Sequence, residues 1–354
     1  MLIAQNRIKL LTCLMIAGSV LVIGCSLQQE DRLPEQTPAA EPQAIQLPEV
    51  EQLKGPHKGV SLSPRSFQSD DFTDFFLKAK QTGESVMWAG DWIELKDVEG
   101  NAPRITAELA TVYNYIPLIE VQFFTQSTGA LVRPLDESTR QIYLDSAVNF
   151  AQKYKPQYLG LGIEVNILYE KSPEDFNRFV RFFDDVYGAV KAVSPNTKIF
   201  TVFQLERMKG LQGGLFGGTN DTSNAQWQLL DSFPKSDLVA FSTYPGLIYK
   251  TPSEMPVDYY AEVKSHTAKA IAFTEIGWHS DVDPVGWESS EAEQAEFVRT
   301  FFNLTKELNL EMAIWSFMYD QKDIDMPFNS MGLRYRSDGT AKLAWNEWIN
   351  AQIR

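Results

Sequence analysis

The chain has 354 residues, a hydrophobic content of 44% and a formal net charge of −14. This length suits one α/β barrel with a leader, and the apolar content can fill a large core, which excludes a largely disordered chain. The acidic balance argues against nucleic acid as a partner and against electrostatic adhesion to anionic lipid.

The first 24 residues have the features of an export signal. Two basic residues, Arg7 and Lys9, precede an apolar run over 10–24 that is too short to span a bilayer comfortably. The run ends in Val-Ile-Gly-Cys, which resembles a bacterial lipobox, so we expect Cys25 to become the lipidated first residue of the mature chain. An uncleaved signal anchor is the alternative, because a positive flank and a short apolar core suit both.

Cysteine usage favours the lipobox. The other cysteine, Cys13, lies in the leader, so a mature chain that begins at Cys25 can form no internal disulfide. Of 32 basic and 46 acidic residues the leader removes two basic ones, which leaves a net charge of −16. We therefore expect the lipid alone to hold the protein in the bacterial cell envelope, at the outer membrane or the cell surface.

Composition divides the rest of the chain into two parts. Residues 25–53 combine the lipidated cysteine with a Pro-, Gln- and Glu-rich stretch without periodicity, which predicts a disordered tether. Residues 54–354 alternate strand-like runs with amphipathic helical stretches, and these are expected to form one catalytic domain.

Eight strands are predicted in this domain. They are 59–63, 85–89, 115–121, 158–164, 198–203, 238–244, 270–275 and 312–317. Helical periodicity between them is clearest over 136–154 and 289–308. Eight βα units predict a (β/α)8 TIM barrel. A doubly wound open sheet is the alternative, but no Gly-x-Gly-x-x-Gly follows the first strand.

Two predicted strands end in a glutamate, and the catalytic groups of such barrels sit at the carboxyl ends of strands. Glu275 closes an apolar strand in which Ile271 and Phe273 share its face, and Glu164 closes the fourth strand, where Gly160 leaves room near the barrel axis. A glutamate in such a strand is either paired in the core or open to a cleft as a functional group. Glycoside cleavage requires two carboxyls, because one protonates the leaving oxygen while the other attacks the anomeric carbon or activates water.

This arrangement resembles clan A of the retaining glycoside hydrolases, whose barrels carry the acid/base at the end of strand 4 and the nucleophile at the end of strand 7. The resemblance makes Glu164 the acid/base and Glu275 the nucleophile. Thr-Glu-Ile-Gly-Trp at 274–278 is similar to the nucleophile strand of the family 17 β-glucanases, and likeness to the family 53 endo-galactanases is about equal. Phe-Ser-Thr-Tyr-Pro at 241–245 resembles the strand 6 segment whose tyrosine, here Tyr244, steadies the nucleophile.

The resemblance and the strand-end aromatics also predict substrate contacts. Trp315, at the end of the eighth strand, resembles the sugar-stacking tryptophan of the clan. Aromatic rings at strand ends stack on pyranose faces, so Trp88 and Trp278 are predicted platforms, with core filling as the alternative. Trp345 and Trp348 lie three apart in the terminal helix and are expected to pack on the barrel.

One departure from the clan concerns the residue before the acid/base, which is usually Asn and is Ile163 here. Asn166 lies on the Glu164 face by alternation, so it is either a substitute for that Asn or a helix-entry residue. Two further residues are candidates for supporting the site. Arg65 lies just past the first strand and is either an ion-pair partner of a catalytic glutamate or a surface residue, and His279 is expected to border the site.

The sequence therefore predicts a retaining glycoside hydrolase that cleaves a β-linked oligo- or polysaccharide by double displacement. Two nearby carboxyls resist joint ionisation, so we expect Glu164 to hold a proton while Glu275 is charged. The alternatives are a non-catalytic carbohydrate-binding surface lipoprotein on a glycosidase-like barrel and a structural envelope lipoprotein. The three histidines lack metal-ligand spacing, and we expect no metal, no cofactor and a monomer.

The lipoprotein prediction can be tested with Cys25→Ala. Because the thiol is the attachment point, the variant should lose labelled fatty acid and move from the membrane to the soluble fraction. Cell fractionation after labelling with palmitate measures both, and Cys13→Ala is the matched control that should leave lipidation unchanged. Equal labelling and equal membrane retention of Cys25→Ala and the wild type would contradict the prediction.

Overall fold

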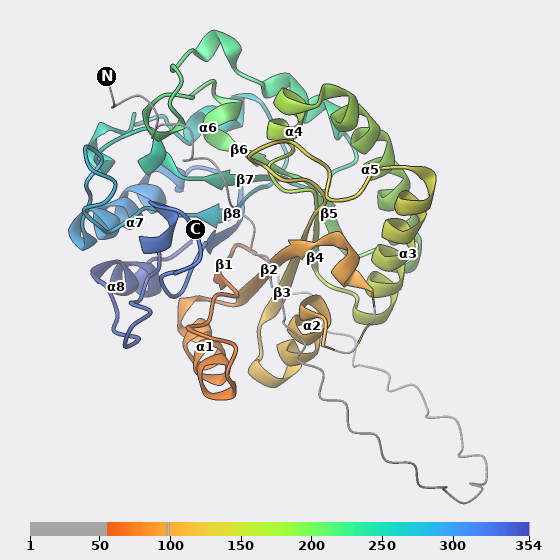
Figure 1. Cartoon of the computed structure of the whole chain (residues 1–354), viewed down its shortest axis with the longest axis horizontal. Coiled ribbons are helices and arrows are strands. Elements are labelled where there is room, and N and C mark those ends of the chain that lie inside the picture. Colours follow the sequence, from red (N-terminus) through yellow and green to blue (C-terminus); the bar gives the residue numbers. More distant parts are fainter. Residues whose placement is uncertain (1–54, 97, 99, 354) are drawn as a thin grey trace, which may run out of the picture.

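The computed structural model describes residues 55–96, 98 and 100–353. In it a nine-stranded parallel sheet curls into a nearly closed barrel with helices around it, as Figure 1 shows. The predicted (β/α)8 fold is confirmed, and the doubly wound alternative is wrong. The predicted leader, the lipidation site at Cys25 and the tether lie outside the described residues. Within those residues, no helix combines the length and the apolar character needed to cross a membrane.

The strands follow the order β5-β4-β3-β2-β1-β9-β8-β7-β6 around the barrel. Their bounds are β1 His57–Ser61, β2 Ser85–Asp91, β3 Ile116–Gln122, β4 Tyr158–Leu161, β5 Lys198–Phe200, β6 Val202–Gln204, β7 Val239–Thr243, β8 Ile271–Ile276 and β9 Leu310–Trp315. β5 and β6 are two halves of the predicted fifth strand, since β5 pairs with β4 and β6 with β7. The N–H of Val202 in β6 donates to the carbonyl of Gly162, directly after β4, at 3.1 Å and so connects β6 with the end of β4.

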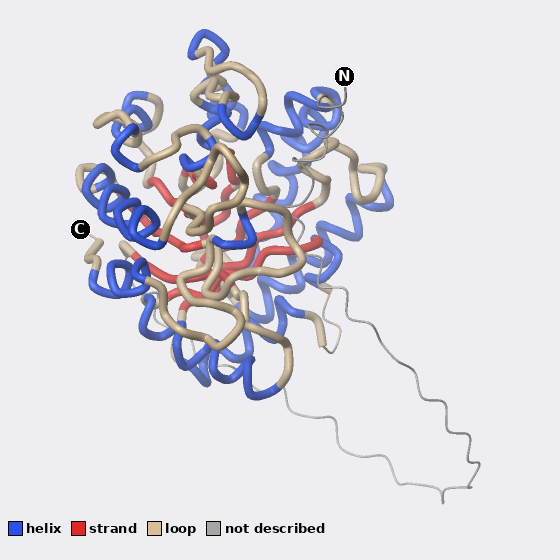
Figure 2. The backbone as a smooth tube through the Cα atoms, turned by 60° about the vertical axis from the view of Figure 1, so that its left-hand side comes forward, coloured by secondary structure: helices blue, strands red, loops and turns tan. Residues whose placement is uncertain are grey.

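Helices cover most of the outside of the barrel. They are α1 Ser69–Thr82, α2 Ala102–Tyr113, α3 Glu137–Tyr154, α4 Val165–Lys171, α5 Pro173–Val193, α6 Leu205–Met208, α7 Glu291–Thr305 and α8 Leu343–Asn350. The segments after β6 and β7 depart from the regular plan, because the one-turn α6 and short 3-10 turns replace long helices there. Figure 2 shows the helices outside the strands and the loops that connect them.

Two apolar layers hold the barrel together. The inner layer contains Met87, Leu118, Tyr158, Phe200, Val202, Ala240, Ala272, Met312 and Ile314. The larger outer layer lies between strands and helices and includes Val60, Ile119 and Phe273. Because side chains alternate along a strand, these two sets show which face each strand residue occupies.

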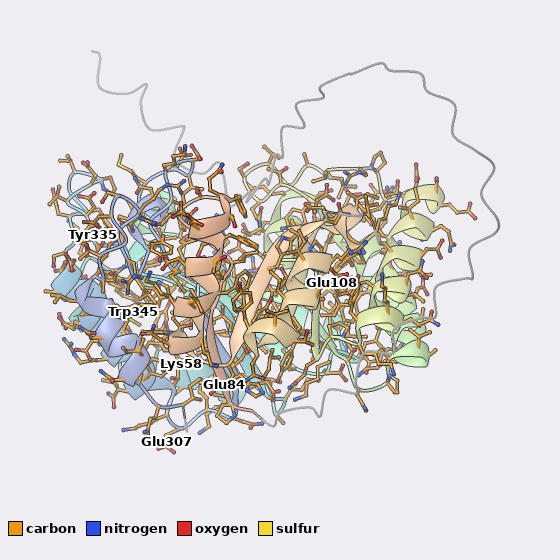
Figure 3. The ribbon with its side chains drawn as sticks, turned by 90° about the horizontal axis from the view of Figure 1, so that it is seen from below. Lys58, Glu84, Glu108, Glu307, Tyr335 and Trp345 are labelled. Atoms are coloured by element: carbon orange, nitrogen blue, oxygen red, sulfur yellow. The ribbon has the colours of Figure 1, made fainter. Side chains whose placement is uncertain are left out.

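The terminal helix α8 packs on the barrel, as its two tryptophans predict. Trp345 and Trp348 are buried, and the rings of Trp348 and Trp315 lie 5.4 Å apart. Lys58 of β1 fixes the end of the helix, since its Nζ donates to the carbonyls of Trp348 and Ala351, each at 2.6 Å. Figure 3 views the molecule with Lys58 and Trp345 labelled. The helix therefore closes the outer layer over β1 and β9.

Gly160 of β4 leads to a prediction about stability. A Cβ at this position would lie 2.8 Å from Cγ of Glu120 and 3.0 Å from the ring of Phe200, both inside the barrel. Gly160→Ala should therefore lower the free energy of unfolding by about 1–3 kcal/mol through overpacking, as measured by urea denaturation.

A second glycine provides the matched control. A Cβ at Gly188, in the middle of α5, would meet nothing within 4 Å. Gly188→Ala should raise the free energy of unfolding by about 0.5–1 kcal/mol, because alanine favours the helix. If Gly160→Ala also raised the free energy of unfolding, the close approach at Gly160 would be contradicted.

Candidate active site

Glu275 lies on β8, and a tyrosine holds its carboxyl. The hydroxyl of Tyr244 donates to Oε2 of Glu275 at 2.6 Å, and Oγ of Ser316 lies 2.9 Å from the same hydroxyl. Tyr244 follows β7 and Ser316 follows β9, so the strands on both sides of β8 contribute to this contact. The structure thus brings together Glu275 and the tyrosine that the sequence predicted as its partner.

A β-bulge turns Glu275 toward the barrel. Ile271 and Phe273 belong to the outer layer, so simple alternation would place Glu275 there as well. The register shifts between Phe273, which pairs with Phe241, and Glu275, which pairs with Ser242. The expectation that Ile271, Phe273 and Glu275 share one face is therefore wrong, because an extra residue in β8 reverses the alternation.

Glu164 lies beyond its strand. β4 ends at Leu161, so the predicted strand over 158–164 is three residues too long. Glu164 is the N-cap residue of α4 and has φ 57° and ψ 42°, in the left-handed region. A non-glycine residue in this region costs about 1–3 kcal/mol, and such strain concentrates at functional sites. Oε1 of Glu164 accepts a hydrogen bond from Oγ of Ser242 at 2.6 Å.

Ser242 of β7 connects the two glutamates. It donates to Glu164, and it is the register partner of Glu275. The negative charge of Glu164 raises the pKa of Glu275, as expected of two carboxyls that face one another. Each residue is only 4% exposed. The structure thus gathers both predicted catalytic residues at the carboxyl end of β7.

Burial raises the pKa of Glu164 to about 7 and that of Glu275 to about 8. The Ser242 hydroxyl and the Arg207 charge lower the pKa of Glu164, and the Tyr244 hydroxyl lowers that of Glu275. Carboxyls this close titrate as a pair, so near neutral pH the pair keeps a proton. The negative charge of Glu206 opposes ionisation of Glu164, as that of Glu164 opposes ionisation of Glu275, so each carboxyl has neighbours that act in both directions.

Glu206, a further buried carboxylate, supports Tyr244. Its Oε1 accepts hydrogen bonds from the N–H of Tyr244 at 3.1 Å and from the hydroxyl of Tyr259 at 2.7 Å. Its neighbour Arg207 pairs with Glu170 at 2.5 Å. Sequence reasoning missed this pair of residues, since the segment after β6 has no periodicity. The charged Glu-Arg dipeptide directly after the strand was the available signal.

The predicted tryptophan platforms lie in the outer layer. Trp88, Trp278 and Trp315 are at most 6% exposed. Nε1 of Trp278 donates to Oγ of Ser289 at 3.0 Å, and Nε1 of Trp315 donates to the carbonyl of Met331 at 2.8 Å. None of the three has a free face on which a sugar could stack, so core filling describes them here.

The amide of Asn166 does not replace the missing asparagine in this structure. Asn166 is fully buried, accepts from the N–H of Gln204 at 2.8 Å and donates to Oε1 of Gln226 at 3.0 Å. It therefore holds the start of α4 against the segment after β6, as a helix-entry residue does. Ile163 belongs to the inner layer, and its carbonyl accepts from Nε2 of Gln122 at 2.9 Å.

Arg65 and His279 also have partners away from the carboxyl pair. Arg65 pairs with Asp71 at the start of α1 rather than with Glu164 or Glu275. His279 is buried, which lowers its pKa, and its Nε2 lies 2.8 Å from the carbonyl of Trp287. No group of three His, Cys, Asp or Glu side chains is arranged to hold a metal in the described part of the chain.

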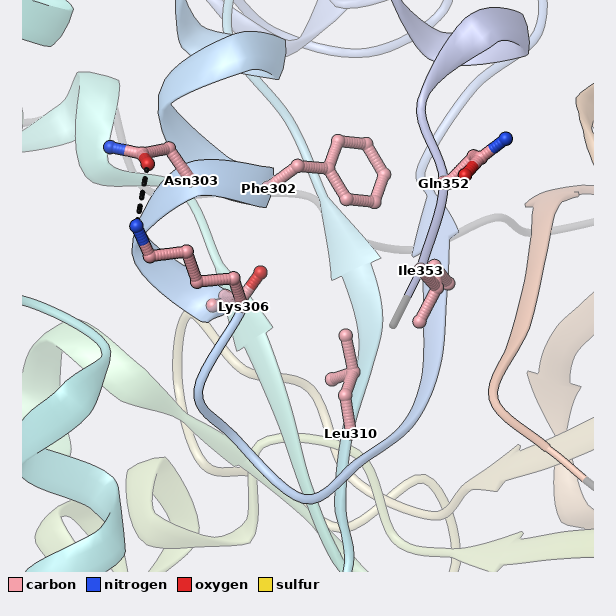
Figure 4. A pocket seen from close by; sticks show the side chains of 7 residues that line it. Phe302, Asn303, Lys306, Leu310, Gln352 and Ile353 are labelled. Atoms are coloured by element: carbon pink, nitrogen blue, oxygen red, sulfur yellow. Dashed lines mark hydrogen bonds between the residues drawn. The ribbon is translucent and has the colours of Figure 1, made fainter.

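A surface pocket at the other end of β9 is separate from this site. It is lined by Phe302, Asn303, Thr305, Lys306, Leu310, Gln352 and Ile353 (Figure 4). Leu310 begins β9, whereas Ser316 of the site follows its last residue. Lys306 is the only ionisable residue in this lining, so the pocket offers no acid or nucleophile pair.

Known proteins resemble this chain in structure but not in sequence. No family model and no curated relative matches the sequence. A family 39 glycoside hydrolase from the gut symbiont Bacteroides cellulosilyticus is similar in structure, with a TM-score of 0.56 and 16% identity over 82% of this chain and 62% of that one. An exo-β-1,4-mannosidase from an Opitutaceae bacterium has a TM-score of 0.57 and 13% identity over 82% of this chain and 58% of that one.

A β-glucuronidase of Bacteroides uniformis is also similar, with a TM-score of 0.58 and 12% identity over 82% of this chain and 34% of that one. The likeness is one of fold. This chain spans between 34% and 62% of the length of these three proteins. The barrel found here is therefore one that glycoside hydrolases also use, while activity has to be argued from the site.

The raised pKa values predict how stability depends on pH. Both carboxyls have folded-state pKa values above the ordinary 4.5. Between about pH 5 and pH 8 the folded protein therefore binds more protons than the unfolded chain, and the free energy of unfolding falls as the pH rises. The double variant Glu164→Gln/Glu275→Gln should flatten this fall, as measured by urea denaturation across that range.

Glu137→Gln is the matched control for this measurement, because Glu137 is exposed in the first turn of α3. It should retain the wild-type dependence on pH. A double variant whose free energy of unfolding fell as steeply as that of the wild type would contradict the raised pKa values.

Proposed function

We propose that this protein is a retaining glycoside hydrolase that cleaves a β-linked oligo- or polysaccharide. The observation that carries the proposal is the convergence of Glu164 and Glu275 on β7, where Ser242 and Tyr244 hydrogen-bond them. Barrels of this type place their catalytic groups at this end, and two facing carboxyls supply the acid and the nucleophile of glycoside cleavage. The shared fold with solved glycoside hydrolases supports it.

In the first step Glu275 attacks the anomeric carbon while the glycosidic bond breaks. Glu164 gives its proton to the leaving oxygen, and a bond forms between the sugar and the Glu275 carboxylate. In the second step Glu164 takes a proton from water, which attacks the anomeric carbon and releases Glu275. The Tyr244 hydroxyl favours the charged form of Glu275 that the first step requires. A pKa of about 7 for Glu164 suits an acid that works near neutral pH.

The finer parts of the proposal rest on sequence. Likeness to families 17 and 53 depends on the segments 241–245 and 274–278, and attachment to a bacterial envelope depends on the lipobox at Cys25. Direct attack predicts a separation of about 5–5.5 Å between the two carboxyl groups and retention of configuration. The expected partner is the carbohydrate substrate, bound by a monomer.

A non-catalytic carbohydrate-binding protein on the same barrel is the second candidate. Two observations favour it: Ile163 stands where the clan has an amide, and both glutamates are only 4% exposed. A hydrolase would have to move loops to admit a sugar to these carboxyls. Screening the purified protein against β-linked polysaccharides and aryl β-glycosides separates the two candidates, because the second binds without turnover.

Azide rescue tests the assigned roles on any aryl β-glycoside that the wild type cleaves. An activated leaving group needs no acid, so Glu164→Ala should form the glycosyl-enzyme but hydrolyse it slowly. Added azide should restore turnover and give a β-glycosyl azide, which reports retention. On substrates with poor leaving groups, this variant should lose about 10²–10⁴-fold in rate.

Glu275→Ala should behave differently, because it lacks the nucleophile. It should lose the covalent step on all substrates, and any azide product should have the opposite, α configuration. Glu137→Ala on the surface of α3 is the control and should match the wild type. If Glu164→Ala and Glu275→Ala both kept near wild-type activity, the catalytic site would lie elsewhere.

A further inference from the structure

Glu120 is a third carboxyl inside the barrel, and the mechanism above does not use it. It lies in the middle of β3, is 0% exposed, and neither of its oxygens has a hydrogen-bond partner in the described part of the chain. Ile119 and Val121 on either side belong to the outer layer, so Glu120 points inward. A buried carboxyl without partners is costly, which calls for a physical reason for its presence.

The neighbouring strand makes room for this side chain. Gly160 of β4 is the register partner of Glu120, and a Cβ at Gly160 would lie 2.8 Å from Cγ of Glu120. The space that the sequence suggested near the barrel axis is therefore filled by the stem of Glu120. A larger residue at position 160 would force this carboxyl out of its place.

Two hydroxyls share the environment of Glu120. Ser61 of β1 and Thr274 of β8 are buried and point inward, and their side-chain oxygens also have no partner among the described residues. β1, β3 and β8 are the first, third and seventh of the eight barrel strands, and inward side chains of alternate strands stack in one layer. The Thr274 hydroxyl is close enough to Glu120 to oppose the rise of its pKa. The layer formed by Ser61, Glu120 and Thr274 is thus polar where barrels usually carry aliphatic side chains.

This polar layer lies next to Glu275. Thr274 precedes Glu275 at the bulge of β8, and the charge of Glu275 acts directly on Glu120. Burial, and then the charge of Glu275, raise the pKa of Glu120 well above its usual value. Both effects favour the protonated form of Glu120, and a protonated carboxyl has an O–H to donate.

Several other charged groups around β3 have partners of their own. On β2, Asp91 pairs with Arg133, and on the outer helix α2, Arg104 pairs with Glu108. Beyond β4, Glu164 is held by Ser242 and acts on Glu275 rather than on Glu120. At the opposite end of the barrel, Lys198 pairs with Glu311. Among these groups, the charge that raises the pKa of Glu120 is that of Glu275.

We propose that Glu120 is a positioning residue for the nucleophile: with Ser61 and Thr274 it forms a polar layer under Glu275 whose O–H groups stabilise the charged carboxylate. Such donors act strongly in the dry interior of a barrel, where the effective dielectric constant is low. The inference rests on the proposed function, since it assigns Glu120 a part in the chemistry of Glu275. Its test is nevertheless made on the free protein.

The experiment follows the titration of Glu275 by carbon-13 NMR, in protein labelled at the glutamate side-chain carboxyl and assigned with Glu275→Gln. Glu120→Met keeps the size of the side chain but removes the donor, so the Glu275 midpoint should rise by about one pH unit, a tenfold change in its ionisation constant. Glu120→Gln retains an N–H donor, and its midpoint should stay within about 0.3 units of the wild type.

Two results would overturn the proposal. An unchanged midpoint in Glu120→Met would show that the layer does not stabilise Glu275. A fall of the midpoint in both variants would show that Glu120 is charged and repels the nucleophile. Leu118→Met, on the same face of β3, is the control for altered packing and should leave the midpoint unchanged. If Glu120→Met fails to fold, Ser61→Ala/Thr274→Val removes the two hydroxyls instead and should raise the midpoint in the same direction.

The readout needs no substrate, so failure of this inference can be told from failure of the proposed function. If the wild type cleaves no β-glycoside while Glu120→Met still raises the Glu275 midpoint, the hydrolase proposal fails. The stabilisation of Glu275 by the polar layer is then still supported. If the wild type is active, the acid limb of its kcat/KM profile should move to higher pH in Glu120→Met by the same amount as the NMR midpoint. If the acid limb of the kcat/KM profile stayed in place while the NMR midpoint of Glu275 moved, Glu120 would have no part in the reaction.

Discussion

The hydrogen bonds from β7 are the interactions on which the candidate site depends. Ser242 donates to Glu164 and Tyr244 donates to Glu275, each at 2.6 Å. Each glutamate is only 4% exposed, so water cannot replace a lost donor easily and an unpaired carboxylate would be costly. Glu206 in turn holds the backbone of Tyr244. One strand therefore positions both carboxyls, and the segment after β6 positions that strand.

Much of the barrel could be predicted from sequence, because its strands are apolar runs that alternate with amphipathic helices. The same property hides which face a residue occupies, since both faces of a parallel strand are apolar. Trp315 was predicted to face the site, yet Ser316 beside it contacts Tyr244. At Glu275 the face is set by a bulge, and its register shift arises from pairing with β7 rather than from local sequence.

Residues around the two glutamates were predictable only where they lie at strand ends. Tyr244 was predicted because the segment 241–245 resembles the strand 6 segment of clan A. Glu206 lies in an irregular segment whose path depends on tertiary packing. Glu120 was not predicted for another reason: it lies in the middle of a strand, and the prediction from sequence considered only the polar residues at strand ends. The signal was nevertheless present, since Ile-Pro-Leu-Ile-Glu-Val contains a single carboxyl within an apolar run.

Three buried carboxyls in one barrel restrict how many negative charges the interior can hold. Burial raises the pKa of Glu120, Glu164 and Glu275, and the charge of Glu275 disfavours ionisation of Glu120 in turn. Every further ionisation costs stability as the pH rises, so the folded protein favours few charges among the three. The donors then decide where a charge resides. Because Ser242 donates to Glu164 and Tyr244 donates to Glu275, whereas neither oxygen of Glu120 has a hydrogen-bond partner among the described residues, these donors favour a negative charge on the Glu164–Glu275 pair over one on Glu120.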